Sequence, residues 1–341
     1  MEMLMVWREG DLVLRMKVGL IDVDSHNFPN LALMRISSYH KSRGDDVDWW
    51  WGMEHYDVVY MSKVFSEAYS PDIPAPLNAD KVIMGGTGYC ITNDENGFEH
   101  FDRSKNNSLP PEIEKMFPDY SIYPKYDFAV AMTSRGCPRG CGFCHVVPKE
   151  GRCSVKVADV SDFWCGQKEI QVLDPNITAC KDKHDLFIQY ADTGAAVDFN
   201  QGLDIRLLTE EDLNDLSKIN LKNIHFAWDN PKDDLGSRFE WYASHTTHKP
   251  KGSCGTVYIL TNYEKCSVEE HVTKALYRIN ILRDLKYDPY LMIYNKPSAP
   301  KVLRDMQRWC NDKRLFKAVK SFDLYKRKVE LQGQTGLWED L

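Results

Sequence analysis

The sequence predicts an α/β protein in which a small sheet domain is followed by a longer series of strands and helices. Three short apolar runs, 17–23, 56–61 and 81–84, are of the buried-strand type, and 31–41 has its apolar residues on one helical face. Strands alternating with helices are typical of parallel sheets. We therefore expect a Rossmann-like, doubly wound domain over 1–102, with any ligand at the carboxyl ends of its strands.

The rest of the chain repeats the order of strand and then helix. The expected strands are 127–133, 169–173, 196–200, 223–228, 255–261 and 290–294. The expected helices are 184–192, 209–218, 268–285 and 301–318. A polar, proline-rich stretch over 103–125 is the expected linker, 126–300 the second domain, and 301–341 a helical extension.

Composition limits the classes of function. The net charge is −7, so the whole chain is not attracted to nucleic acid, and 43% hydrophobic residues fit a packed globular protein. We find no apolar run of the length that spans a membrane and no signal peptide, because Arg8 and Glu9 interrupt the apolar N-terminal stretch. We therefore expect a reducing, cytoplasmic location, with free thiols at the seven cysteines outside the motif described next.

Three cysteines lie in one short loop after the expected strand 127–133. Cys137, Cys141 and Cys144 have the spacing C-x3-C-x2-C, and glycines at 136, 140 and 142 allow the backbone to wrap closely around a ligand. Three thiolates are one fewer than a closed iron–sulfur or zinc site uses. A site with an open coordination position indicates chemistry and not a purely structural role.

This loop resembles that of the radical S-adenosylmethionine (SAM) enzymes, including the aromatic Phe143 before the last cysteine. The resemblance implies that the three cysteines hold a [4Fe-4S] cluster whose open iron binds SAM. One electron then splits SAM into methionine and a 5′-deoxyadenosyl radical, which abstracts a substrate hydrogen. It also implies a partial (β/α)6 radical-SAM barrel over 126–300 and a reductant such as flavodoxin or ferredoxin as a partner.

A zinc site is the alternative interpretation of the loop. The three cysteines and His145 would form a Cys3His set. However, His145 directly follows Cys144, so its side chain would have to fold back over its neighbour. An auxiliary cluster is not favoured, because the other cysteines are too widely spaced.

Polar residues after the expected strands are candidates for binding SAM. Asp174 and Asn176 follow the second strand of the series, where the resemblance implies a group near the SAM amino nitrogen, although the usual Gly-Gly-Glu is absent. Asp229 ends the fourth strand, where the family often binds the ribose. Arg206 could pair with the SAM carboxylate, and a surface ion pair is the alternative.

The first domain resembles cobalamin-binding domains in the order of its motifs. Asp24 and His26 follow the first strand, Ser62 follows the next of the three apolar runs, and Gly85-Gly86 follows the last. In that family the histidine ligates cobalt. Pro29 stands where the family has a glycine, so we expect a degenerate domain in which cobalamin is possible but not favoured.

The segment 301–328 contains ten lysines and arginines with interleaved aromatic residues. This pattern is compatible with a nucleic-acid surface, and a solvated amphipathic helix is favoured. Three functions stay open: hydrogen abstraction from an unidentified substrate, cobalamin-dependent methyl transfer, and a non-catalytic metal-binding scaffold. The specific reaction and the substrate do not follow from the sequence.

Overall fold

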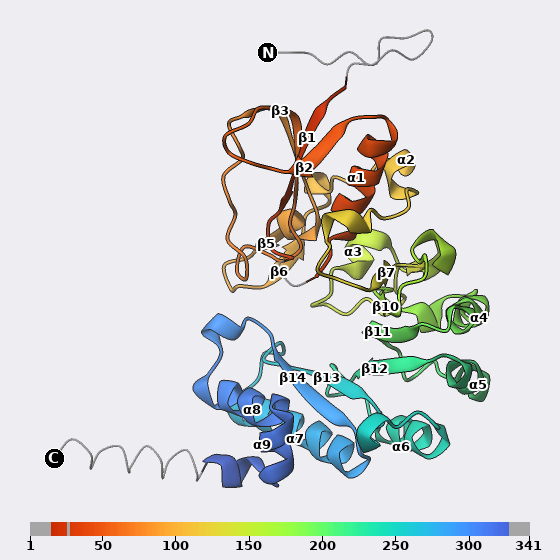
Figure 1. Cartoon of the computed structure of the whole chain (residues 1–341). Coiled ribbons are helices and arrows are strands. Elements are labelled where there is room, and N and C mark those ends of the chain that lie inside the picture. The colour runs from red at the N-terminus through yellow and green to blue at the C-terminus, as the bar shows by residue number, and fades with distance from the viewer. Residues whose placement is uncertain (1–14, 26–27, 327–341) are drawn as a thin grey trace, which may run out of the picture. The chain divides into compact units, whose positions relative to one another are not determined.

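A computed structural model describes residues 15–25 and 28–326 of the chain. The chain divides into two compact units, and each is described by itself. The first unit comprises 1–153 with 157–170, and the second comprises 154–156 with 171–341. Figure 1 shows the elements of both units in chain order. Within the described ranges, no helix is long and apolar enough to cross a membrane.

The first unit contains a four-stranded parallel sheet with the strand order β2-β1-β3-β4. Its strands are β1 (Lys17–Asp22), β2 (Asp46–Trp49), β3 (Tyr56–Ser62) and β4 (Ala79–Gly85). The predicted strands correspond to β1, β3 and β4. Strand β2, a short strand at the edge of the sheet, was not predicted.

Helix α1 (Leu31–Ser42) begins where predicted, because the side chain of Asn30 accepts a hydrogen bond from the backbone N–H of Leu33 and caps the helix. Its apolar face contributes to a core cluster with β1 and β3, formed by Val18, Leu20, Leu33, Ile36, Val58 and Ile113. The stretch 103–125 belongs to this unit, and its short helix α2 (Pro111–Glu114) contacts α1.

The expected doubly wound arrangement is not what the first sheet shows. In the described structure, the connections 50–55 and 63–78 between its strands contain no helix, so α1 is the helix that joins two strands of the sheet. Three prolines, Pro71, Pro74 and Pro76, explain the irregular second connection. Each lacks a backbone N–H and clashes with a preceding turn, which prevents a regular helix.

The remaining strands and helix of the first unit come before and after the cysteine loop in the sequence. They are β5 (Ile91–Asn93) and β6 (Glu99–Phe101), which pair antiparallel, then β7 (Ala129–Ala131), β8 (Ser134–Arg135) and helix α3 (Val146–Glu150). The cysteines therefore follow β7, the first strand expected in the second series, and precede α3.

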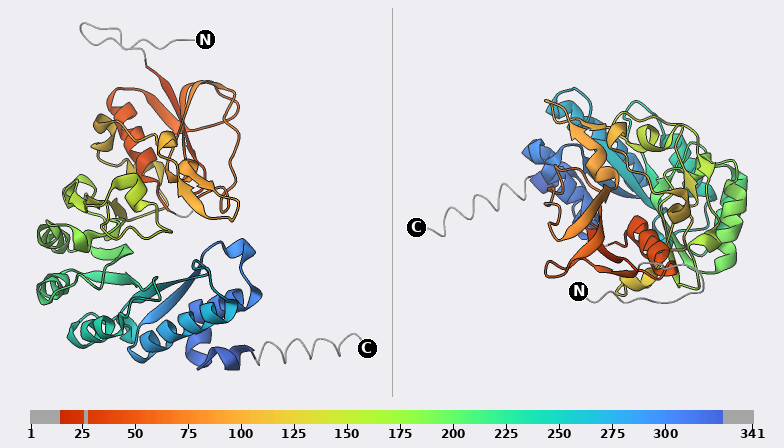
Figure 2. Two further views of the ribbon diagram at one scale, coloured as in Figure 1. Left: turned by 180° about the vertical axis from the view of Figure 1, so that it is seen from behind. Right: turned by 90° about the horizontal axis from the view of Figure 1, so that it is seen from above.

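The second unit has strands in the order β14-β13-β12-β11-β10, with β11 to β14 parallel. The strands are β9 (Val155–Lys156), β10 (Glu169–Val172), which crosses the boundary between the units, β11 (Ala196–Leu203), β12 (Leu221–Ala227), β13 (Thr256–Thr261) and β14 (Asp288–Ile293). The helices are α4 (Lys183–Thr193), α5 (Glu210–Lys218), α6 (Gly236–His245), α7 (Val268–Asp284), α8 (Lys301–Asn311) and α9 (Lys313–Ala318). Figure 2 shows these helices from behind, with α4, α5 and α6 in a row.

The chain is thus a mixed α/β protein with parallel sheets, as predicted. Two details of the second unit differ from the expectation. Helix α6 was missed, and the helix expected over 301–318 is two helices. The break lies at Asp312, whose carboxylate accepts hydrogen bonds from the backbone N–H groups of Arg314 and Leu315 and so starts α9.

Candidate functional site

The cysteine loop is fixed at its start by a close approach of two backbone segments. Gly136 has φ +89°, and a Cβ atom added there would lie 2.0 Å from the carbonyl oxygen of Cys153. The backbone N–H of the next residue, Cys137, donates to the carbonyl of Gly151 at 3.2 Å. Only glycine fits the first of these positions. The loop therefore starts from a rigid anchor on the segment after α3.

Within the loop, Gly140 is a second left-handed position, with φ +63°. The turn over 141–144 is closed by a hydrogen bond from the N–H of Cys144 to the carbonyl of Cys141, at 3.0 Å, and Gly142 lies inside this turn. Cys141 is exposed, and Cys137 and Cys144 are half-buried. The thiols thus belong to a surface loop that an incoming cluster can reach.

The side chain of His145 already contacts a carboxylate, which a zinc ligand at this position would have to give up. Its Nε2 lies 3.2 Å from a carboxylate oxygen of Glu99, and its ring packs near Phe101 at 6.4 Å between centroids. An imidazole held by a carboxylate of β6 would have to leave that partner to become a fourth ligand. The contact favours the three-cysteine interpretation over the Cys3His alternative.

The donor set of the loop fits an iron–sulfur cluster. Thiolates are the ligands of such clusters, and three of them leave one iron open. In the part of the chain that the structure describes, no three His, Cys, Asp or Glu side chains already converge as they would around a metal ion. The loop itself supplies the three thiolates from one short stretch of chain.

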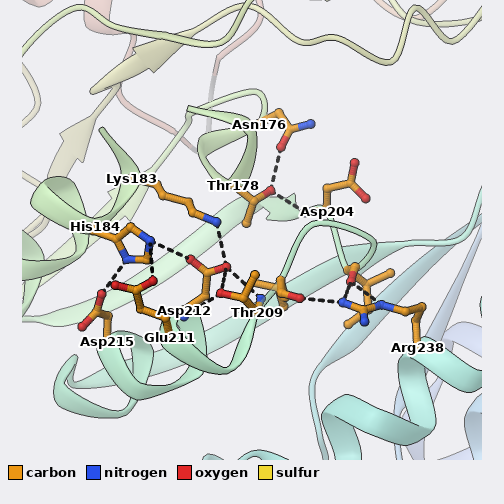
Figure 3. A network of polar contacts seen from close by, with 12 residues as sticks. Asn176, Thr178, Lys183, His184, Asp204, Thr209, Glu211, Asp212, Asp215 and Arg238 are labelled. Atoms are coloured by element: carbon orange, nitrogen blue, oxygen red, sulfur yellow. Dashed lines mark hydrogen bonds and ion pairs between the residues drawn. The ribbon is translucent and has the colours of Figure 1, made fainter. Parts of the chain in front are cut away.

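The predicted SAM-contacting residues belong to the second unit, whereas Phe143 and the three cysteines belong to the first. Asp174 and Asn176 are buried in the loop after β10. The amide oxygen of Asn176 accepts a hydrogen bond from the hydroxyl of Thr178 at 2.7 Å, and that hydroxyl accepts from the backbone N–H of Asp204 at 3.0 Å (Figure 3). This chain of contacts joins the loops after β10 and β11.

The same view shows a second set of contacts between the first turns of α4 and α5. The ammonium of Lys183 donates to the buried carboxylate of Asp212 at 2.8 Å, and Asp212 completes a capping box with Thr209 (Figure 3). His184 lies 2.8 Å from a carboxylate oxygen of Asp215. These pairs hold α4 and α5 together.

Arg206 has carboxylate partners within its own unit. Its Nε donates to Asp204 at 2.7 Å, and a terminal nitrogen donates to Asp233 at 2.8 Å. This geometry supports the ion-pair alternative for Arg206. By pairing with both Asp204 and Asp233, the guanidinium of Arg206 links the loop after β11 to the loop after β12.

Asp229 lies at the carboxyl end of β12 and is half-buried. Its Oδ1 accepts a hydrogen bond from the N–H of Leu260 at 3.1 Å. Burial raises the pKa of Asp229 to about 6, and the nearby guanidinium of Arg278 opposes this shift. Arg278 is buried and donates to the carbonyls of Trp228, Asp229 and Leu260 at 2.6, 3.0 and 3.1 Å. Arg278 therefore positions the loop that carries Asp229.

The sheet of the second unit has a polar face that was not predicted. Phe199 of β11 packs on α4 and Phe226 of β12 packs on α6, so the residues that alternate with them face the other side. Among these are Asp198, His225 and Tyr258. His225 lies 3.2 Å from the Asp198 carboxylate and 3.0 Å from the Tyr258 hydroxyl. Their alternation with apolar residues was the signal in the sequence.

The cobalamin-type motif of the first unit is engaged in local contacts. The carboxylate of Asp24 accepts hydrogen bonds from the N–H groups of Val64 and Phe65, both at 2.8 Å. Gly86 has φ +102°, and a Cβ there would lie 2.2 Å from the carbonyl oxygen of Lys63. Asp24 therefore joins the loop after β1 to the loop after β3, and Gly86 lets the loop after β4 approach that same loop closely.

Ser62, another member of that motif, is also engaged in a local contact. The hydroxyl of Ser62 accepts a hydrogen bond at 2.9 Å from the side-chain amide of Asn30, the residue after Pro29. His26, the expected cobalt ligand, lies outside the described residues. Beside Ser62 and Gly86 there is an apolar cavity of about 190 Å³ between α1 and the ends of β3 and β4.

The aromatic residues of the basic C-terminal segment are buried. Trp309, Phe316, Phe322 and Tyr325 are at most 7% exposed and form a cluster of their own. Proteins that bind single-stranded nucleic acid stack the bases on exposed aromatic rings, and these buried rings cannot do so. The aromatic pattern therefore reflects packing, and residues 327–328 of the segment lie outside the described residues.

Comparison with known proteins gives a likeness in structure alone. No protein-family model matches the sequence, and no curated protein matches it. The fold is similar to that of the radical S-adenosylmethionine methyltransferase TsrM from Kitasatospora setae, solved with cobalamin and a [4Fe-4S] cluster bound. The TM-score is 0.58 at 10% identity, over 82% of this chain and 72% of that chain. The chain shares the fold of a radical SAM enzyme.

Proposed function

We propose that this protein is a radical SAM enzyme that uses a [4Fe-4S] cluster to cleave SAM reductively and abstracts hydrogen from its substrate. One observation carries the proposal. A C-x3-C-x2-C loop follows β7 in a chain whose fold is similar to that of a radical SAM enzyme. An open-site thiolate loop and this fold are independent features, and both indicate the same chemistry.

In this proposal Cys137, Cys141 and Cys144 hold the cluster, and Phe143 packs beside it. When bound, the cluster supplies the open iron and the electron that cleavage of SAM requires. The protein's part is to bind SAM, orient it and exclude water. A reductant such as flavodoxin or ferredoxin, in the cytoplasm, would deliver the electron.

Asp229 is the residue we assign to the SAM ribose. A carboxylate accepts two hydroxyl hydrogen bonds well, and Arg278 fixes the backbone on which Asp229 stands. Asp174 and Asn176, in the loop after β10, are assigned to the methionyl end of SAM; strand β11 lies between β10 and β12 in the sheet. Arg206 supports these loops through Asp204 and Asp233, and we do not assign it to the cofactor.

The polar face around Asp198, His225 and Tyr258 is the surface we assign to the substrate. It carries hydrogen-bonding groups on a sheet whose opposite face is packed with helices. The half-buried imidazole of His225 contacts both the buried carboxylate of Asp198 and the half-buried phenol of Tyr258, and these groups would bind a substrate that offers several hydrogen-bonding groups. A purely apolar substrate would leave these groups without partners.

The test is SAM turnover by the anaerobically reconstituted protein with a strong reductant. We expect methionine and 5′-deoxyadenosine in equal amounts, formed slowly without substrate. Asp229→Ala should weaken SAM binding by about 1–3 kcal/mol, since two ribose hydroxyls lose their acceptor. Asp192→Ala, an exposed change on α4, is the matched control and should leave SAM affinity unchanged. If Asp229→Ala folds and binds SAM normally, the ribose assignment is wrong.

Cobalamin-dependent methyl transfer is the second candidate function. It is favoured by the cobalamin bound to the similar structure and by the apolar cavity beside Ser62. The contacts of Asp24 and Gly86 argue against it, because they use the motif to close loops. Retention of stoichiometric hydroxocobalamin after gel filtration, lost on His26→Ala, would decide for methyl transfer. A protein that holds metal but never cleaves SAM would instead be a scaffold.

A further inference from the structure

A cationic cavity lies at the amino-terminal edge of the sheet in the second unit. It measures about 220 Å³ and includes Ser253, just before β13, and Asp288, the first residue of β14. The residues proposed to bind SAM follow the carboxyl ends of the strands. The cavity is therefore a separate site, at the other edge of the same sheet.

Four positive side chains line this cavity: Arg283, Lys286, Lys317 and Lys320. In the described part of the chain, none of the four has a carboxylate partner in an ion pair. Asp288, the acidic residue of the lining, is paired with Lys313 at 2.9 Å. Four like charges around one hollow repel each other, and a bound anion relieves that repulsion. This clustering occurs in a chain whose net charge is −7.

The backbone at Lys286 is a second, independent observation. Lys286 has φ +66°, the left-handed conformation that usually ends a helix at glycine or asparagine. It follows the last turn of α7, and its carbonyl accepts a hydrogen bond from Cys254 at 2.9 Å. Glycine would adopt this conformation without strain, so a lysine here indicates a use for the side chain.

Arg283 is held in place before any ligand arrives. Its guanidinium lies 3.7 Å from the ring centroid of Phe316 and 4.9 Å from that of Trp309. It donates to the carbonyls of Phe316, at 3.3 Å, and of Lys320. Burial lowers the pKa of Arg283, and the carboxylate of the adjacent, exposed Asp284 partly opposes this shift. A fixed guanidinium loses little freedom on binding an oxyanion, for which its fork of donors is well suited.

We propose that this cavity binds the phosphate group of a small ligand. A phosphate dianion matches four cations better than a carboxylate does, and arginine and lysine are its usual partners. The volume suits one such group and not an extended strand. The neighbouring aromatic rings are buried and cannot stack on bases. This site is independent of the proposed radical chemistry.

The competing explanation is that these cations only complement helix dipoles. Arg283 and Lys286 lie at the carboxyl end of α7, and Lys317 is in the last turn of α9. On that explanation, removing the charges lowers stability and changes no binding. The two explanations therefore predict different results for the same variants.

Isothermal titration calorimetry of the full chain with inorganic phosphate and with adenosine 5′-monophosphate is the test. We expect saturable binding of at least one, weakened about tenfold or more by Lys317→Gln with Lys320→Gln, since charged hydrogen bonds are lost. The control, Arg304→Gln with Arg308→Gln, removes two exposed charges of α8 that do not line the cavity, and should bind normally. Stronger binding of the monophosphate than of free phosphate would indicate that the phosphate group bound by this cavity belongs to a nucleotide.

Lys286→Gly gives the decisive signature. It should raise the thermal midpoint, because strain is removed, and at the same time weaken phosphate binding. No binding of either probe, equal weakening by the control pair, or unchanged binding in Lys286→Gly would each overturn the proposal. Binding of a single-stranded RNA oligonucleotide with no binding of the two small probes would also overturn it, in favour of a nucleic-acid surface.

Discussion

Replacement of Asp229 by asparagine tests the electrostatics of the proposed cofactor site. Burial raises the pKa of this carboxyl to about 6. The amide keeps the shape and the acceptor for the N–H of Leu260, so the variant removes the charge and little else. In the wild-type protein the charged form of Asp229 therefore destabilises the folded state above the folded pKa.

The direction follows from proton linkage. The folded state holds the proton up to a pH of about 6, and the unfolded state releases it near 3.8. Wild-type stability therefore falls as pH rises between these values, by at most about 3 kcal/mol. Between pH 4.5 and 7.5 the expected loss is about 2 kcal/mol. Asp229→Asn lacks this loss, so its advantage over wild type grows by about the same amount.

The assay is urea unfolding of both proteins at pH 4.5 and 7.5, followed by fluorescence, since the buried Trp228 adjoins Asp229. Asp192→Asn, an exposed change, is the control and should follow wild type at both values. SAM binding by Asp229→Asn should be weaker than wild type at pH 7.5, although the variant is more stable there. A variant whose stability relative to wild type is the same at both pH values would refute the reasoning.

Three further changes test other parts of the account. Gly136→Ala should abolish iron binding, because the new Cβ would lie 2.0 Å from a carbonyl oxygen. The control is Gly151→Ala, which also has a positive φ (+97°) but no atom within 4 Å of the new Cβ, and it should retain iron. Equal iron contents in the two variants would contradict the role of Gly136 in anchoring the cysteine loop. Arg278→Met should cost about 3–5 kcal/mol in urea unfolding and raise the pKa of Asp229 further, since three carbonyls and a carboxylate lose a buried cation. His145→Gln should keep its iron in metal analysis, and loss of the metal would favour the Cys3His site.

Local signals in the sequence predicted most of the elements. The buried-strand runs gave β1, β3 and β4, and the cap at Asn30 lies where α1 was expected to begin. Elements without such signals were missed. Strand β2 is a short edge strand, and α6 begins at Gly236 with no capping side chain. The doubly wound arrangement is not confirmed, since the connection that contains Pro71 holds no helix in the described structure.

The sequence predicts the type of candidate site, a thiolate loop, but not most of the contacts that its residues make. Glycine positions in the cysteine loop follow from the sequence, because close backbone approach requires them. The contacts of Arg206 with Asp233, of Asp24 with the loop after β3 and of His145 with β6 do not follow, since each joins residues that are far apart in the chain. The same holds for Tyr258, whose contact with His225 depends on the register of neighbouring strands.

The central claim is that the cysteine loop holds an open-site [4Fe-4S] cluster that binds SAM. The direct measurement is iron and sulfide content with electron paramagnetic resonance of the anaerobically reconstituted, reduced protein. We expect about four irons and about four sulfides per chain, and a signal that SAM perturbs, both lost in Cys141→Ala. A protein that binds one zinc ion and no iron under the same conditions would contradict the account.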